Sequence, residues 1–175
     1  MMGRMIRKIG VMAGAGALFF LAAGAHADNG LAAEIGRGDE NTNLLRLSVT
    51  STWRKGEPAA PDWHLVGYWE FSAAIWDNHD ESTADVSATP VFRLARAAAY
   101  VEGAIGVHLV TSHISAQRTF SSAFQFGTHA GAGYRFGPAR RYDLGLRVQH
   151  ISNGGLREPN PGINFVLLRF QYDLQ

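Results

Sequence analysis

The chain has 175 residues, no cysteine and a formal net charge of +1, and 46% of its residues are hydrophobic. Without cysteine, disulfides cannot stabilise the fold, so stability has to come from packing or from closure of a sheet. The near-neutral charge offers no global basic field for nucleic acid, which is therefore excluded as the expected partner.

The first 27 residues have the parts of a secretory signal: an apolar run over residues 11–23, the small-residue ending Ala25-His26-Ala27, and before these the basic residues Arg4, Arg7 and Lys8. The apolar run is short for a spanning helix, so cleavage is favoured over a retained membrane anchor. Cleavage removes three positive charges and no acidic residue, which changes the formal charge from +1 to −2. We therefore predict a signal peptide over 1–27 and one domain over 28–175.

Apolar and polar residues alternate along the rest of the chain, between clusters of Gly, Pro, Asn, Asp and Ser. A period of two residues is typical of strands with one apolar face, and no segment after the signal has a convincing helical period. The predicted strands, in chain order, cover about 30–36, 43–53, 65–75, 86–94, 101–109, 124–136, 144–152 and 163–174. The sequence therefore predicts an all-β fold of eight strands.

Eight such strands fit a soluble sandwich or lipocalin-like barrel with apolar faces inward, or an outer-membrane barrel with apolar faces toward lipid. Charges of both signs recur opposite the apolar residues, as expected for a narrow lumen filled by paired side chains: Arg46, Glu70, Glu102, His108, Arg135, Arg147 and Arg169. Aromatic residues lie toward strand ends, where membrane-interface girdles form: Trp53, Trp69, Trp76, Tyr134, Phe136 and Tyr172. Alternation alone leaves the soluble fold open, but export without cysteine favours an eight-stranded antiparallel transmembrane β-barrel of the outer membrane.

His150 and Ser152 continue the apolar face of strand 144–152, because residues two apart in a strand point the same way. A serine becomes a useful nucleophile when a neutral imidazole can take its proton. His-x-Ser alone is a weak signal, because a lone histidine on a strand is more often an ordinary solvated or interfacial side chain. A polar pair on a lipid-facing surface costs free energy, however, which favours a functional role.

The run His150-Ile-Ser-Asn-Gly-Gly-Leu-Arg-Glu-Pro-Asn-Pro-Gly-Ile closely resembles the C-terminal signature of the lipid A 3-O-deacylase family of Gram-negative outer membranes. Earlier stretches are similar to the same family: Gly67-Tyr-Trp-Glu70, Thr89-Pro-Val-Phe-Arg93 and Val101-Glu-Gly-Ala-Ile-Gly-Val107. The resemblance implies an eight-stranded barrel with a hydrolase site on its outer wall, near the external leaflet.

Carried over residue by residue, the resemblance implies that Ser152 is the nucleophile and His150 the general base. It further implies that Asn160 and the backbone N–H of Gly155 form an oxyanion hole, which stabilises the charge developing on the attacked carbonyl. Asn153 matches a recurring family residue, and a site role and a turn role remain open for it. Asn and Gly are ordinary turn residues, so a plain hairpin loop explains residues 153–155 equally well.

The chain departs from the family at Asn164, which stands where the family has an acidic residue. An amide oxygen can accept a hydrogen bond from the imidazole but carries no charge to stabilise the imidazolium. Papain-like enzymes use asparagine in this role, whereas the aspartate-to-asparagine change in a serine protease lowers turnover about 10⁴-fold. Glu158, in the loop before Asn164, is the alternative source of a carboxylate, although it reads more readily as a solvated loop charge.

The predicted function is hydrolysis of the ester-linked 3-position hydroxyacyl chain of lipid A, with His150, Ser152 and Asn164 as the catalytic residues. We expect no metal and no cofactor, and lipid A or lipopolysaccharide among outer-membrane lipids as the partner, with a homodimer left open. Three basic loop residues are candidates to meet lipid A phosphates, with solvated charge as the alternative: Arg118, Arg140 and Arg157. An outer-membrane phospholipase and a non-catalytic barrel with a degenerate triad remain the competing functions.

Overall fold

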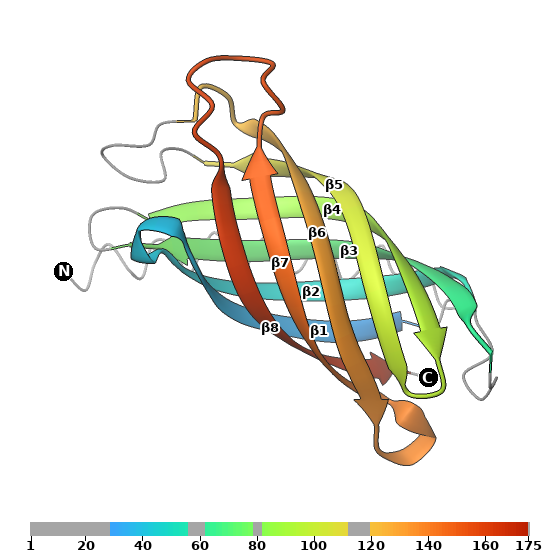
Figure 1. The fold of residues 1–175 in the computed structure, drawn as a ribbon. Coiled ribbons are helices and arrows are strands. Elements are labelled where there is room, and N and C mark those ends of the chain that lie inside the picture. Colours follow the sequence, from blue (N-terminus) through green and yellow to red (C-terminus); the bar gives the residue numbers. More distant parts are fainter. Residues whose placement is uncertain (1–28, 56–61, 79–81, 112–119, 175) are drawn as a thin grey trace.

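The computed structural model describes residues 29–55, 62–78, 82–111 and 120–174, so the predicted signal peptide lies outside the described residues. The strands are β1 (Asn29–Gly38), β2 (Asn43–Arg54), β3 (His64–Asp77), β4 (Ser82–Arg96), β5 (Ala99–Val110), β6 (Phe124–Phe136), β7 (Tyr142–Ser152) and β8 (Ile163–Leu174). Each strand pairs antiparallel with the next, and β8 pairs with β1, so the sheet closes into a barrel (Figure 1). The predicted eight-stranded antiparallel architecture is confirmed.

The first strand is longer than the sequence pattern indicated, since the predicted segment 30–36 is part of β1. Glycine and alanine give this segment little intrinsic strand preference. Closure of the barrel stabilises this strand despite its low intrinsic strand propensity, because β1 is hydrogen-bonded to β2 on one side and to β8 on the other. Gly36 also permits a close approach, as a Cβ at this position would lie 2.2 Å from the backbone oxygen of Val166.

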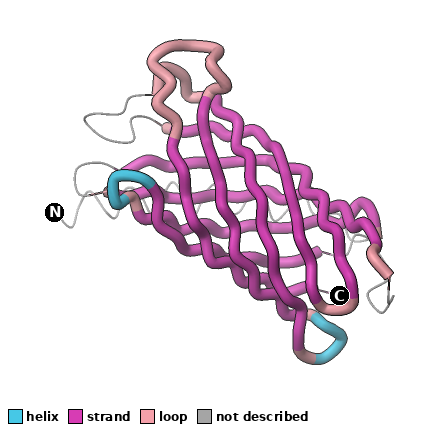
Figure 2. Tube along the Cα trace, viewed as in Figure 1, coloured by secondary structure: helices cyan, strands magenta, loops and turns pink. Residues whose placement is uncertain are grey.

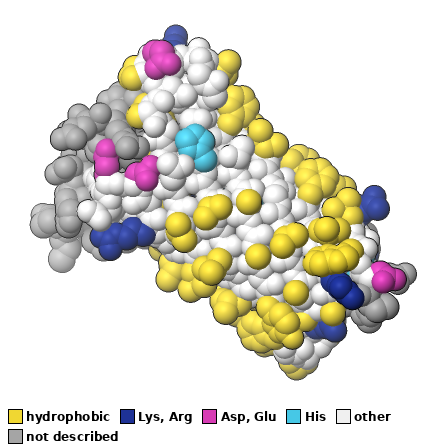
Figure 3. Space-filling view, viewed as in Figure 1, with side chains coloured by type: hydrophobic (Ala, Val, Ile, Leu, Met, Phe, Trp, Pro, Cys, Tyr) yellow, Lys and Arg dark blue, Asp and Glu magenta, His cyan; other side chains and the backbone are white. Residues whose placement is uncertain are grey.

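The outer face of the barrel is a continuous apolar surface. Leu146 is 60% exposed and Val166 59% exposed, and the hydrophobic side chains form a band around the visible face (Figure 3). Apolar exposure on this scale would be unfavourable in water and is the pattern of a barrel embedded in lipid. None of the helical segments within the four described ranges is long and apolar enough to cross a membrane.

The lumen is filled by paired charges. The Arg147 guanidinium reaches three carboxylates, with distances of 2.6 Å to Glu34 Oε1, 2.9 Å to Glu70 Oε1 and 2.6 Å to Glu102 Oε1. All four side chains are buried, so the network closes the middle of the lumen. Of the polar residues predicted to face inward, Arg46, Glu70, Glu102, His108, Arg147 and Arg169 are buried and Arg135 is half-buried.

One predicted girdle residue is wrongly placed, because Trp76 is buried inside the barrel. It shares the inward parity of Glu70, Ser72 and Ala74 on β3 and packs against Phe165, with ring centroids 5.4 Å apart. Its place at a strand end suggested a girdle, but strand parity decides the direction of the side chain. The other predicted girdle residues are accessible: Trp53, Trp69, Tyr134 and Phe136 are exposed and Tyr172 is half-buried.

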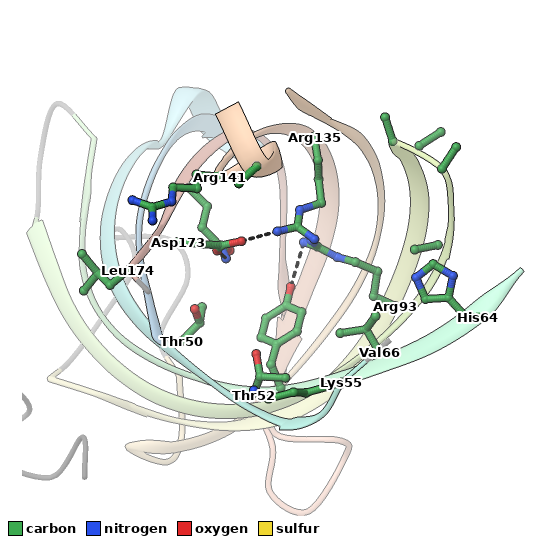
Figure 4. A pocket seen from close by; sticks show the side chains of 17 residues that line it. Thr50, Thr52, Lys55, His64, Val66, Arg93, Arg135, Arg141, Asp173 and Leu174 are labelled. Atoms are coloured by element: carbon green, nitrogen blue, oxygen red, sulfur yellow. Dashed lines mark hydrogen bonds and ion pairs between the residues drawn. The ribbon is translucent and has the colours of Figure 1, made fainter. Parts of the chain in front are cut away.

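The two ends of the barrel differ. The two short 3₁₀ turns, η1 (Asp39–Asn41) and η2 (Pro138–Arg140), lie at opposite ends, and the loop between β7 and β8 lies at the η1 end (Figure 2). The η2 end is also where β1 starts and β8 finishes, and in outer-membrane barrels that end faces the periplasm. A cavity of about 460 Å³ opens there, where Arg135 pairs with Asp173 and Arg93 donates to the Tyr68 hydroxyl (Figure 4).

Candidate active site

The predicted catalytic residues gather at the η1 end of the β7–β8 hairpin. His150 pairs with Asn164 across the two strands, and Ser152 ends β7 two residues further along. Since Leu144, Leu146 and Val148 point outward, the alternation carries His150 and Ser152 to the outer wall. Of the histidines in the described ranges, His150 is the exposed one, and a histidine is visible beside acidic side chains at the margin of the apolar band in Figure 3.

His150 and Asn164 are in direct contact. The distance from His150 Nδ1 to Asn164 Oδ1 is 2.8 Å, which is a good hydrogen bond. An amide oxygen only accepts, so Nδ1 carries the proton and Nε2 is left as the basic nitrogen. Asn164 Oδ1 therefore lies where it can accept the Nδ1 proton of His150.

Ser152 lies next to this pair, and its hydroxyl is within 3.4 Å of the Gly154 backbone N–H, which donates to it. Residues two apart on a strand have Cβ atoms about 6–7 Å apart, so the serine and the imidazole approach each other by side-chain rotation. Catalytic hydrogen bonds are often long before substrate binds. The arrangement therefore has a serine hydroxyl and an imidazole on the same face, with Nδ1 of the imidazole bonded to Asn164.

The backbone that carries the pair is anchored from inside the barrel. Ile151 lies between His150 and Ser152 and is fully buried, and Ile163 precedes Asn164 and is 1% exposed. They belong to an apolar cluster at this end of the lumen: Leu44, Ala74, Trp76, Val110, Phe120, Ile151, Ile163, Phe165 and Leu167. A site on strands fixed by a packed core is more rigid than one on a loop.

Asn153 organises the loop that follows Ser152. Its side chain is 1% exposed, accepts from Gly155 N at 2.9 Å, and donates to Arg157 O at 2.6 Å and to Ser121 Oγ at 3.1 Å. The sequence left a site role and a turn role open for this residue. Its contacts here fix the loop between β7 and β8.

The two residues predicted to form the oxyanion hole lie in this loop. Asn160 Oδ1 accepts from Asn153 N at 3.0 Å, which leaves the Nδ2 donor of Asn160 facing away from that contact. The Gly155 N–H is engaged by Asn153 Oδ1, so a substrate oxygen would have to replace that acceptor. Glu158 accepts from Asn160 N at 3.0 Å, while Asn164 takes the imidazole bond for which Glu158 was the alternative acceptor.

Sequence reasoning missed Asp39, in η1. Its Oδ2 accepts from both the backbone N and the side-chain Nδ2 of Asn164, each at 3.0 Å. No local motif joins residues 39 and 164. Barrel closure is the feature that brings them together, since Gly38 at the end of β1 pairs with Phe165 and the residue after β1 therefore comes opposite Asn164.

A shallow groove of about 660 Å³ runs along the outer wall beside these residues. His150, Asn164 and Asp39 line one part, and outward side chains of β6, β7 and β8 continue it: Thr128, Ala130, Val148 and Val166. An apolar groove leading to a polar end suits a chain with a polar group at one end. Within the described ranges, no group of three or more His, Asp or Glu side chains has the geometry of a metal site.

Of the three arginines predicted to meet phosphates, the two in the described ranges, Arg140 and Arg157, lie at opposite ends of the barrel. Arg140 donates to Ala97 O in the turn between β4 and β5, at the end opposite the catalytic residues, so this prediction is wrong for Arg140. The error arose because loop residues carry no sequence mark of the barrel end on which they lie. Arg157 is exposed in the β7–β8 loop, and Arg118 lies outside the described residues.

Comparison with known proteins adds the family context. The model of the family described as lipid A 3-O-deacylase (PagL) matches residues 43–173. The lipid A deacylase PagL of Pseudomonas aeruginosa is 29% identical over 139 residues, which cover 76% of this chain and 79% of that protein. The lipid A deacylase PagL of Bordetella bronchiseptica is 42% identical over 87 residues, and this match spans 49% of the chain and about half, 48%, of the relative.

Solved structures agree on the architecture. The crystal structure of the outer membrane enzyme PagL superposes with a TM-score of 0.72 and 25% identity, covering 83% of this chain and 99% of that one. The N-terminal β-barrel domain of Pseudomonas aeruginosa OprF superposes with a TM-score of 0.53 at 10% identity, over 83% of this chain and 98% of that one, and this likeness concerns the fold alone.

Proposed function

This chain belongs to the lipid A 3-O-deacylase (PagL) family and is an outer-membrane β-barrel, and on that premise we propose that Ser152 and His150 hydrolyse the 3-position ester of lipid A on the lipid-facing wall. One observation carries the proposal. His150 and Ser152 share the outward face of β7, and Asn164 Oδ1 holds His150 Nδ1 at 2.8 Å, which leaves Nε2 as the base.

The mechanism follows from these atoms. Ser152 Oγ attacks the ester carbonyl carbon while His150 Nε2 takes the hydroxyl proton. The tetrahedral intermediate carries its negative charge on the former carbonyl oxygen, where Asn160 Nδ2 and the Gly155 N–H act as donors. His150 then protonates the leaving 3-hydroxyl, and a water activated by the same imidazole releases the hydroxy fatty acid from Ser152.

The position of the site supports a lipid substrate. His150 lies where the apolar outer face of β7 ends, and the groove beside it continues along the wall past Val148 and Val166. In a lipid the ester linkages lie between the polar head and the acyl chains, so a membrane-embedded barrel can meet them at this depth. The substrate then reaches Ser152 by lateral diffusion and need not leave the bilayer.

The first test is mass spectrometry of lipid A from cells that produce this protein or its Ser152→Ala variant. We expect loss of one ester-linked 3-hydroxyacyl chain with the parent protein and unchanged lipid A with the variant. Unchanged lipid A in both, with folded protein present in the outer membrane, would contradict the proposal. Loss of acyl chains from glycerophospholipids in place of lipid A would identify a phospholipase on the same scaffold.

Removal of the base gives an independent check. His150→Gln should lower the rate as strongly as Ser152→Ala, because residues that act as one catalytic unit have non-additive effects. The double variant should therefore be no slower than either single variant. A double variant that is slower by the product of the two single effects would mean that the two side chains do not act together.

A further inference from the structure

The uncharged residue at position 164 raises the question of how an asparagine keeps a catalytic histidine in the right tautomer. Resting on the proposed function above, we propose that Asp39 is a positioning residue of the deacylase site, which acts through Asn164 on His150. The family's carboxylate at position 164 is thereby replaced by two residues from opposite ends of the chain, an amide that contacts the imidazole and an acid that fixes the amide.

The contacts define the direction of every hydrogen bond in this relay. Asp39 Oδ2 accepts from Asn164 Nδ2 and from the Asn164 backbone N, each at 3.0 Å. An ionised carboxylate only accepts, so the NH₂ group of Asn164 has to face Asp39 and its Oδ1 has to face His150. His150 Nδ1 must therefore be the donor in the 2.8 Å contact, and Nε2 keeps its lone pair for the serine proton.

Without a fixed acceptor at position 39 the amide has two orientations. The alternative orientation points Nδ2 at His150 Nδ1, which then has to accept, so the ring proton moves to Nε2. An imidazole protonated at Nε2 cannot take the proton of Ser152. A wrong tautomer is the cause given for the roughly 10⁴-fold loss when the triad aspartate of a serine protease becomes asparagine, and that loss sets the upper limit expected here.

The turn that carries Asp39 does not depend on the carboxylate for its backbone hydrogen bonds. Gly38 N donates to Thr42 O at 2.7 Å, and Thr42 N donates to the backbone oxygen of Asp39 at 3.1 Å. Gly38 is also paired with Phe165 of β8, which holds the turn beside Asn164. A side-chain substitution at position 39 therefore leaves these backbone contacts in place, and its effect can be assigned to the side chain.

The first experiment measures hydrolysis of purified lipid A by the full-length mature barrel in detergent, for the parent protein, Asp39→Ala and Glu40→Gln. Asp39→Ala removes the oxygen that accepts from both Nδ2 and the backbone N of Asn164, so either amide orientation at Asn164 becomes possible, and we expect kcat/KM to fall at least tenfold. Glu40→Gln removes the same formal charge from the neighbouring residue of the same turn and should change kcat/KM less than about twofold. Equal activity of Asp39→Ala and the parent protein would overturn the proposal.

A carboxylate restored at position 164 separates positioning from a merely structural role. In the double variant Asp39→Ala/Asn164→Asp, the carboxylate at 164 accepts directly from His150 Nδ1 and needs no side chain at 39 to orient it. We expect activity within about threefold of the parent protein, well above that of Asp39→Ala alone. A folded double variant no more active than Asp39→Ala would overturn the relay, because a structural defect in the turn would not be rescued by a change at 164.

The tautomer can be read without any turnover. ¹⁵N NMR of ring-labelled histidine, with His150→Gln to assign the His150 signals, should show the Nδ1–H form in the parent protein and the Nε2–H form or a mixture in Asp39→Ala. Identical His150 ring shifts in the two proteins would contradict the relay. If the parent protein proves inactive on lipid A, the proposed function fails, while the ring shifts still decide the action of Asp39.

Discussion

Gly162 leaves little room beside the imidazole of His150, the proposed base, and its substitution tests how precisely the end of the loop positions this ring. A Cβ at residue 162 would lie 2.8 Å from Cε1 and 3.3 Å from Nε2 of His150. Ordinary contact begins at 3.4 Å, so the ring or the loop would have to move by about 0.6 Å. A misplacement of 1 Å can cost about 10²-fold in rate, so we expect Gly162→Ala to lower kcat/KM at least tenfold.

Backbone strain has to be separated from this contact, because Gly162 has a φ of +60°. A left-handed conformation costs a residue with a Cβ roughly 1–2 kcal/mol. Gly154→Ala is the matched control, since Gly154 lies in the same loop with a φ of +67° but its added Cβ would meet Phe126 at an ordinary 3.4 Å. Both variants share the strain, and only Gly162→Ala crowds His150.

The assay is release of 3-hydroxy fatty acid from purified lipid A, measured together with the urea midpoint of the barrel. We expect similar midpoints for the two variants and a rate loss confined to Gly162→Ala. Equal rate losses in both variants would show that loop strain, and not contact with His150, controls activity. A fully active Gly162→Ala would show that the imidazole position is not critical on the scale of half an ångström.

Three further substitutions test the barrel and the loop. Arg147→Met leaves three buried carboxylates without their shared partner and should reduce the free energy of unfolding by about 3–5 kcal/mol, measured by urea titration of refolded barrels. Leu146→Arg puts a charge on the lipid face in the middle of β7 and should cost about 2–4 kcal/mol in the same titration, so an unchanged midpoint would contradict the lipid-facing assignment. Asn153→Ala removes the acceptor of Gly155 N and the donors to Ser121 and Arg157, which should reduce the free energy of unfolding by about 1–3 kcal/mol and lower the urea midpoint accordingly. Deacylation by the folded variant without urea should still fall at least tenfold.

The fold could be predicted because a barrel in lipid imposes a strict rule on every strand. Alternation with a period of two places Leu146 outside and Arg147 inside, and the same parity holds around the closed sheet. The direction of a side chain depends on its odd or even position in the strand and not on the residue type. The one wrong girdle prediction, for Trp76, relied on residue type. Trp76 is an aromatic residue at a strand end, but it shares the parity of Glu70 and therefore packs inside.

Local spacing predicted the relative positions of the candidate residues that lie on one hairpin, β7–β8. The strand pattern put His150 and Ser152 on one face, and the pairing of β7 with β8 makes the His150–Asn164 contact a neighbour relation across two strands. Spacing could not indicate which end of the barrel a loop occupies, so Arg140 was grouped with Arg157 although it bonds to the turn at Ala97. That information depends on the number of strands that precede each loop.

Asp39 illustrates what a local motif cannot contain. It follows β1, whereas Asn164 begins β8, and closure of the sheet alone makes them neighbours. Judged by position 164 within the motif, the chain has lost its acid and resembles a degenerate enzyme. In the folded barrel, the amide of Asn164 lies between the Asp39 carboxylate and the His150 imidazole and is hydrogen-bonded to both. The proposal for Asp39 therefore predicts that an amide can replace a triad acid where the fold places a carboxylate on that amide, and in this barrel the carboxylate comes from the turn after the strand that closes the sheet.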